Sequence, residues 1–236
     1  MKRLWLIPFG GLVIVLALSA AVWLAVPRGE ALVAYYPFEP VGRTWEYVVT
    51  DGAIGRKGSA VFVARGAGTF ADKPTLVIAV EREMPGDADA GGSKVGVLNH
   101  FTVTDAAVHQ LALEWANVRD PRQGGKVIYN PPVAIAKLPL RAGATWETST
   151  QIHSPRDDGD FRASSKRYVH VMGREAVEVP AGRFDTLRVE IRTISLREGR
   201  TEPTESVRTE WRVRGIGLVK LTEGPFELAL KSHAEK

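Results

Sequence analysis

Two kinds of hydrophobic pattern divide the chain. Residues 4–26 form an unbroken run without a charged side chain, whereas the rest of the chain carries short apolar runs separated by Gly, Pro and polar residues. About 20 consecutive apolar residues cross the hydrocarbon core of a bilayer as a helix. We therefore expect a membrane-spanning helix within residues 1–26 and a folded domain after it.

The pattern of the folded part is that of antiparallel β structure. In residues 184–196, Leu187, Val189 and Ile191 alternate with charged residues, which predicts one apolar and one solvated face. Gly and Pro recur about every ten residues between such runs, a spacing typical of a sandwich or barrel. The expected strands cover residues 44–50, 59–64, 75–83, 95–104, 107–114, 145–153, 161–172, 175–179, 184–196, 204–213, 217–222 and 226–231.

The fold class that follows is mainly β. We expect one antiparallel domain, as a curved sheet, an open-barrel-like arrangement or a sandwich, and the long strand at 184–196 favours the curved forms. Residues 106–117 leave open a short helix. The expected divisions are a signal-anchor helix at 1–26, a tether at 27–36, the β domain at 37–232 and a tail at 233–236. Polar, Gly- and Pro-rich loops are expected at 84–93, 118–126, 153–160 and 197–204.

The apolar run has the features of an uncleaved anchor. Lys2 and Arg3 precede it, so the positive-inside rule places the N-terminus in the cytoplasm and the domain outside. Trp5 and Trp23 lie near its ends, where amphipathic rings favour the membrane interface. A cleaved signal peptide is the alternative, but its apolar core is usually shorter. The run also holds small residues that would permit close helix packing, namely Gly10, Gly11, Ser19, Ala20 and Ala21.

One five-residue pattern occurs twice. The segment G-x-T-W-E begins at Gly42 and again at Gly143, in each case a few residues after a proline. Gly suits the turn, and Thr and Trp suit the strand that follows. Shared turn chemistry is the favoured interpretation, and two β halves of common construction is the alternative.

Three segments resemble a known group of proteins. They are Tyr35-Tyr36-Pro37 with the following G-x-T-W-x-Y, the V-P-A-G-x-F-D-x-L stretch of residues 179–187, and the ending from Glu210-Trp211 to Lys220. In this order they resemble uncharacterised exported bacterial β domains, some of which are labelled the TapB family. The resemblance covers about residues 35–230. It implies an antiparallel, lipoprotein-like domain of the cell envelope with no established catalytic residues.

Composition and charge exclude several classes of function. The chain contains no cysteine, which removes disulfides, thiolate metal sites and cysteine catalysis. Its 31 basic and 27 acidic residues become 29 and 27 once Lys2 and Arg3 are set aside, a balance of +2. That balance is too even to indicate nucleic acid as a partner.

Metal-binding patterns are weak. No histidine pair has the H-x-x-x-H spacing, although His100 and His109 could meet across a hairpin, with Glu114 nearby, as a two- or three-ligand site. The acidic residues 157–160 offer oxygen ligands for Ca²⁺, but neither they nor residues 87–92 complete an EF-hand loop. Separate hydrogen bonds and plain turns are the simpler interpretations. We expect no cofactor.

Catalytic motifs are missing from the sequence. It contains no G-x-S-x-G elbow, Walker loop, dinucleotide fingerprint or H-E-x-x-H. The arginines of residues 188–214 alternate with glutamates such as Glu205 and Glu210, which favours a solvated sheet face over a phosphate site. Of the tryptophans in the β domain, Trp115 is the one considered as an exposed partner contact, because it precedes a predicted loop.

The expected function is non-catalytic. We expect a membrane-anchored envelope protein whose extracytoplasmic β domain binds a protein or a lipid-like partner. One alternative is an accessory structural subunit of a larger membrane complex that uses the helix as its interface, and a weaker one is a hydrolase with a dispersed site. The expected location is the bacterial inner membrane, with a single pass at 4–26 in contact with the lipid bilayer and a protein partner in the membrane or envelope.

The first prediction concerns the N-terminus. When the tagged chain is extracted from its native membrane in mild detergent, N-terminal sequencing should find Met1, and the particle should be much larger than one chain. An anchored subunit would bring its partner with it. A mature N-terminus beyond Ala20 in a soluble monomer would contradict the anchor.

Overall fold

A computed structural model describes residues 32–84, 93–118, 124–155 and 160–235 of the chain. These residues belong to one compact unit. None of the helices within them is long and apolar enough to cross a membrane. The predicted span at 4–26, with Trp5, Trp23, Gly10 and the other small residues, lies outside the described residues.

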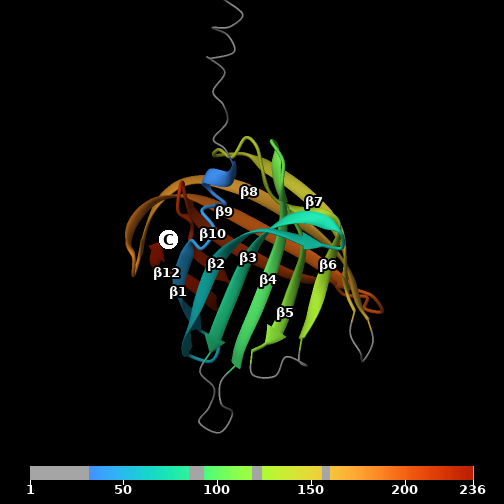
Figure 1. The fold of residues 1–236 in the computed structure, drawn as a ribbon. Coiled ribbons are helices and arrows are strands. Elements are labelled where there is room, and N and C mark those ends of the chain that lie inside the picture. Colours follow the sequence, from blue (N-terminus) through green and yellow to red (C-terminus); the bar gives the residue numbers. More distant parts are fainter. Residues whose placement is uncertain (1–31, 85–92, 119–123, 156–159, 236) are drawn as a thin grey trace, which may run out of the picture. The chain divides into compact units, whose positions relative to one another are not determined.

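Among the described residues, the structure has twelve strands (Figure 1). A 3-10 turn, η1 (Leu32–Ala34), precedes them. The strands are β1 (Thr44–Asp51), β2 (Arg56–Phe70), β3 (Lys73–Met84), β4 (Ser93–Val103), β5 (Ala107–Asn117), β6 (Gly124–Lys137), β7 (Thr145–Ser154), β8 (Phe161–Val179), β9 (Gly182–Arg197), β10 (Thr204–Val213), β11 (Gly217–Glu223) and β12 (Phe226–Ala234).

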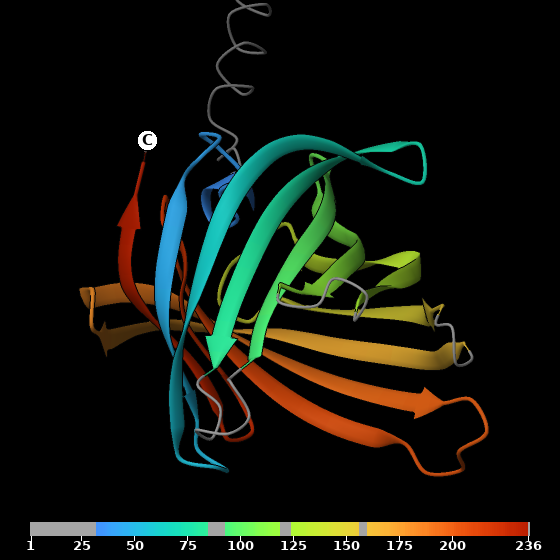
Figure 2. The same cartoon turned by 60° about the horizontal axis from the view of Figure 1, so that its bottom comes forward.

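The sheet closes on itself. Each strand pairs antiparallel with its neighbours in sequence, and β1 pairs with β12, with Thr44 opposite Ala234 and Asp51 opposite Phe226. Figure 2 shows β8, β9 and β10 running across β2, β3 and β4 on the other side of the barrel. The antiparallel β fold and the preference for a curved form are thus confirmed, but the barrel is closed, so the open arrangement and the sandwich are wrong. Closure removes the two free edges that an open sheet would expose.

The strand missing from the prediction is β6. Pro131 and Pro132 interrupt its apolar run, and a proline has no N–H to donate to a ladder. Pairing with β7 accordingly covers only Ile128–Asn130. Beyond that point side chains of β7 bridge the two strands: Thr150 Oγ1 donates to the carbonyl of Pro131 at 2.7 Å, and Trp146 Nε1 donates to that of Ala134 at 3.2 Å.

Two further sequence expectations are corrected. The short helix left open for residues 106–117 is wrong: the strand expected at 107–114 is confirmed as β5, which pairs with β4 on one side and β6 on the other. The predicted strands 161–172 and 175–179 are one strand, β8, with a register shift at Gly173 that lets it continue. The expected hairpin at Val179-Pro180-Ala181-Gly182 is present, with β8 ending at Val179 and β9 beginning at Gly182.

The two G-x-T-W-E segments open hairpins of the same construction. Gly42 and Gly143 both have positive φ, 89° and 80°. Each donates its backbone N–H to the second strand of its hairpin at 2.8 Å, Gly42 to Ala64 of β2 and Gly143 to Val171 of β8. Both strands carry a register shift directly after that residue. The correspondence therefore extends beyond the turn, as two related halves of six strands would require.

The segment before β1 fills part of the barrel. Leu32, Tyr35, Tyr36 and Phe38 are all buried, and they pack with Val108, Val169, Val171, Leu187 and Val189 in one core cluster. A second cluster contains Trp45, Tyr47, Val49, Val219, Leu228 and Leu230. Residues 32–36, expected to belong to a tether, are thus part of the domain because their large apolar side chains have an interior to occupy. At the other end, His233 and Ala234, expected in the tail, are part of β12.

Burial of Leu32 gives a stability prediction. Leu32→Ala should lower the free energy of unfolding by about 2–4 kcal/mol, the usual cost of truncating a buried leucine, because only 3% of Leu32 is exposed. Val41→Ala is the matched control, since Val41 is 62% exposed, and it should change stability by no more than about 0.5 kcal/mol. Urea unfolding of the full-length chain measures both. Equal, small effects would show that residues 32–36 act only as a tether.

Candidate functional site

A cavity of about 270 Å³ lies inside the barrel, between strands of both halves. Six aromatic side chains line it, together with aliphatic residues of β3, β9, β11 and β12. The aromatic lining residues are Tyr36, Phe38, Trp45, Tyr47, Phe62 and Phe101. Polar groups reach it at two places, the amide pair of Asn99 and Gln110 and a group of charged residues on β8 and β10.

The aromatic wall presents its apolar parts to the cavity. Period-two alternation along β1 turns Trp45 and Tyr47 inward. Their polar atoms are bonded to the backbone of the neighbouring wall: Trp45 Nε1 donates to the carbonyl of Ile216 at 2.6 Å, and Tyr47 Oη donates to that of Leu218 at 2.8 Å. With these donors satisfied, the rings form a surface that is apolar and fixed in orientation.

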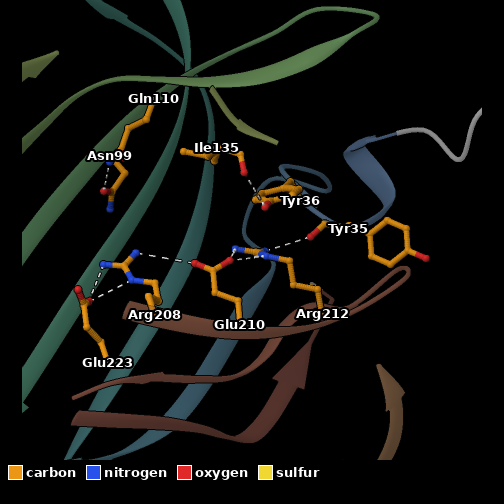
Figure 3. A network of polar contacts seen from close by, with 9 residues as sticks. All are labelled: Tyr35, Tyr36, Asn99, Gln110, Ile135, Arg208, Glu210, Arg212 and Glu223. Atoms are coloured by element: carbon orange, nitrogen blue, oxygen red, sulfur yellow. Dashed lines mark hydrogen bonds and ion pairs between the residues drawn. The ribbon is translucent and has the colours of Figure 1, made fainter. Parts of the chain in front are cut away.

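The charged group is carried by alternate residues of β10. Arg208, Glu210 and Arg212 face inward, and Figure 3 shows them as one row. Arg212 Nε donates to Glu210 Oε2 at 2.8 Å, and Arg208 Nη1 lies 3.8 Å from Glu210 Oε1. Arg208 also donates to Glu223 Oε2 through Nη2 at 2.9 Å. The solvated face expected for Glu210 is therefore wrong: only 5% of this residue is exposed.

The segment before β1 holds one end of this row. Arg212 Nη1 donates to the carbonyl of Tyr35 at 3.2 Å, and the Arg212 guanidinium lies 3.8 Å from the centre of the Tyr36 ring (Figure 3). Tyr36 Oη in turn donates to the carbonyl of Ile135 on β6 at 3.3 Å. Tyr35 and Tyr36 therefore connect the segment before β1 with β6 and β10.

Burial raises the pKa values of Tyr36 and Glu210, whereas the neighbouring arginines lower them. Burial raises the pKa of Tyr36 to about 12, so its hydroxyl stays protonated and able to donate. Burial would also raise the pKa of Glu210, but Arg212 and Arg208 outweigh it and hold that pKa below its usual value. Glu210 is thus an ion-paired carboxylate at neutral pH. It is not poised to accept and release a proton.

Arg167 of β8 is the fourth charged residue of the lining. Its guanidinium carbon lies 5.8 Å from the centre of the Tyr129 ring, and its Nε is buried without a hydrogen-bond partner. Within the described part of the chain, no carboxylate lies in salt-bridge range of it. Burial lowers the pKa of Arg167 and repulsion from Arg208 adds to this effect, although a hydrogen bond with Tyr129 and attraction by Glu210 act in the opposite direction. Arg167 is therefore a cation that contacts Tyr129 but, among the described residues, has no carboxylate paired with it directly.

The structure separates the histidines considered for a metal site. His100 is buried, with Nδ1 3.2 Å from Thr75 Oγ1 and Nε2 3.2 Å from Glu114 Oε2. His109 lies opposite Thr102 and joins neither contact. No cluster of three metal-ligating side chains occurs among the residues that the structure describes. His100 and Glu114 therefore meet as a hydrogen-bonded pair, without His109.

Two other sequence candidates lie away from the cavity. Trp115 is half-buried against Gly125 of the adjacent strand β6, and its role as a partner contact stays a prediction. Of the acidic residues 157–160, only Asp160 is described, and it pairs with His153 at 2.8 Å. Residues 87–92 lie outside the described residues.

Sequence reasoning missed the cavity residues because they come from distant strands. The alternation of Arg208, Glu210 and Arg212 was visible, but an alternating strand does not say which face is inside. One available signal was the aromatic content of the segment before β1 and of β1 itself, where Tyr36, Phe38 and Tyr47 lie close together in the sequence.

Comparisons with known proteins show only distant likeness. No protein-family model and no curated protein matches the chain. A "putative lipoprotein" from Parabacteroides distasonis superposes with a TM-score of 0.48 at 14% identity, over 84% of this chain and 98% of that one. A "putative exported protein with YmcC-like fold" from Bacteroides fragilis gives a TM-score of 0.43 at 12% identity, over 84% and 97%. Membership of the TapB family stays a prediction.

The buried carboxylate gives a prediction for stability and its pH dependence. Glu210→Gln should lower the free energy of unfolding by about 3 kcal/mol at pH 7, because it leaves the largely buried Arg212 without its charge partner. Since the folded-state pKa of Glu210 is depressed, its stabilisation is complete above the unfolded value of about 4.3. It is lost as the pH falls through the folded pKa. The difference between wild type and variant should therefore shrink below about pH 4.

Glu205→Gln is the control for that variant. Glu205 lies on the same strand and pairs with Arg192 at 2.7 Å, but both side chains are half exposed. Its loss should lower the free energy of unfolding by less than about 1 kcal/mol. Equilibrium urea unfolding between pH 3 and 7 compares the two variants. A Glu210 variant as stable as the Glu205 variant would show that the interior ion pair is not needed.

Proposed function

We propose that this protein is an envelope binding protein whose β barrel holds a lipid-like ligand in its interior. The observation that carries the proposal is the interior cavity itself, with six aromatic side chains around it. Apolar pockets with a few convergent polar groups are the usual form of small-molecule sites. A protein partner would instead need an outer apolar surface.

Several features of the cavity favour binding over catalysis. Its lining residues include no histidine, serine, threonine or lysine within the described part of the chain. Glu210, the one carboxylate among the described lining residues, forms ion pairs with Arg208 and Arg212. A hydrolase would need a base or nucleophile able to change its protonation state near neutral pH.

The proposed location rests on the sequence. The apolar run at 4–26 would anchor the barrel in the cytoplasmic membrane, with Lys2 and Arg3 on the cytoplasmic side. The barrel would then be extracytoplasmic, where a chain without cysteine depends on its core alone for stability. An accessory role in a larger membrane complex would use the same run as an interface, and the particle mass described above distinguishes it.

Filling the cavity tests the proposal. Val80 lines the cavity from β3, so Val80→Trp should occupy the space and weaken binding of the neutral probe 1-decanol by about tenfold or more. Val207→Trp is the control, because Val207 is an apolar residue of β10 with 45% exposure. Titration calorimetry of the full chain in phosphatidylcholine nanodiscs, with empty nanodiscs subtracted, measures both. A wild type that binds neither decanol nor any other ten-carbon amphiphile would contradict the proposed function.

A further inference from the structure

The charges around the cavity do not cancel. Arg208, Glu210, Arg212 and Glu223 form a connected row of two cations and two anions. Arg167 adds a third cation from the neighbouring wall, and none of the salt bridges within the described residues involves it. The interior therefore carries one uncompensated positive charge beside an apolar wall.

The surroundings of Arg167 do not explain this charge. Its neighbours in β8 on the inward face are Ser165 and Val169, both buried and both uncharged. Tyr129 provides a hydrogen bond and a ring at 5.8 Å, which is at the limit of a cation–π contact, but no negative charge. Arg167 is half-buried with its Nε fully buried, and a cation withdrawn from water without an ionic partner is costly. An arginine retained in such a place is suited to a negative group supplied from outside.

Arg208 lies near enough to contribute to the same site. Repulsion between the two guanidinium groups is part of what lowers the pKa of Arg167. Arg208 is already bonded to Glu223, but its side chain remains 40% accessible. An anion next to Arg167 would also relieve the repulsion between these two cations.

We propose that the ligand is an amphipathic anion, a single hydrocarbon chain with a carboxylate or phosphate head, and that Arg167 binds the head beside Arg208. This inference rests on the proposed function, because the chain would occupy the aromatic part of the same cavity. Guanidinium groups donate two parallel hydrogen bonds to either kind of head. The head group would meet the cations of β8 and β10 while the hydrocarbon chain meets Phe62 and Phe101.

The size of the cavity limits the hydrocarbon part. At about 270 Å³ it lies just below the range of roughly 300–1,000 Å³ that is usual for small-molecule sites. One chain of medium length fits such a volume. A lipid with two long chains would not fit without displacement of the aromatic wall or of the segment 32–38.

Titration calorimetry with matched probes tests the inference. The full chain in phosphatidylcholine nanodiscs is titrated with decanoate, decyl phosphate, 1-decanol and inorganic phosphate, and empty nanodiscs are subtracted. We expect decanoate and decyl phosphate to bind about tenfold or more tightly than decanol, because a charge-assisted hydrogen bond adds to the same apolar contact. The tighter of the two anions identifies the head group. Inorganic phosphate should bind far more weakly than either.

Arg167→Gln should lower the affinity for both anions by about tenfold or more, to roughly that for decanol, and should change the affinity for decanol much less. Arg162→Gln is the matched control on the same strand, since Arg162 is exposed and pairs with Asp160 outside the cavity. It should bind all probes as the wild type does. Arg167→Lys keeps the charge but not the fork of donors, so it should retain part of the preference for anions.

The outcomes separate this inference from the proposed function. Equal affinity for decanol and decanoate, or an Arg167→Gln variant that still prefers the anions, would overturn the anionic ligand and leave the apolar site in place. Inorganic phosphate binding as tightly as decyl phosphate would overturn it in favour of a simple anion site. Failure of every ten-carbon probe would contradict the proposed function itself.

Discussion

Closure of a sheet with twelve strands is the constraint on which the rest of this structure depends. Pairing of β1 with β12 leaves no free edge, but it also sets the width of the interior. Eight strands enclose a space that side chains can just fill, and the diameter grows with the number of strands. A barrel of twelve therefore holds more space than its own inward side chains occupy. The buried segment 32–38, the large aromatic residues and the remaining cavity all follow from that excess.

The ion pair between Glu210 and Arg212 also helps to fill the wide interior of the barrel. Glu210 and Arg212 are buried, and burying two charges usually costs more than their attraction returns. Here the pair also fixes the segment before β1, because Arg212 contacts both the carbonyl of Tyr35 and the ring of Tyr36. The charged row thus holds the N-terminal segment in place, and it gives one side of the cavity a polar character that the aromatic wall lacks.

This division of the interior connects structure with function. An aromatic wall whose polar atoms are satisfied by backbone carbonyls is suited to hydrocarbon, and an arginine without an ionic partner is suited to a negative head group. No catalytic group is required for either task. An apolar run at 4–26 would keep such a barrel beside a membrane, where amphipathic molecules are abundant.

Local patterns in the sequence determined the strands and several turns. Alternation predicted β9 and β10 closely, and Gly182 in the V-P-A-G stretch predicted the turn between β8 and β9, because both depend on neighbours in the chain. β6 was missed where Pro131 breaks its pattern. The closed barrel and the cavity were decided only in three dimensions. Alternation shows that the strands carrying Glu210 and Arg192 each have two faces, but it does not show which face is buried. Only the pairing of β1 with β12 closes the sheet and makes one face the interior.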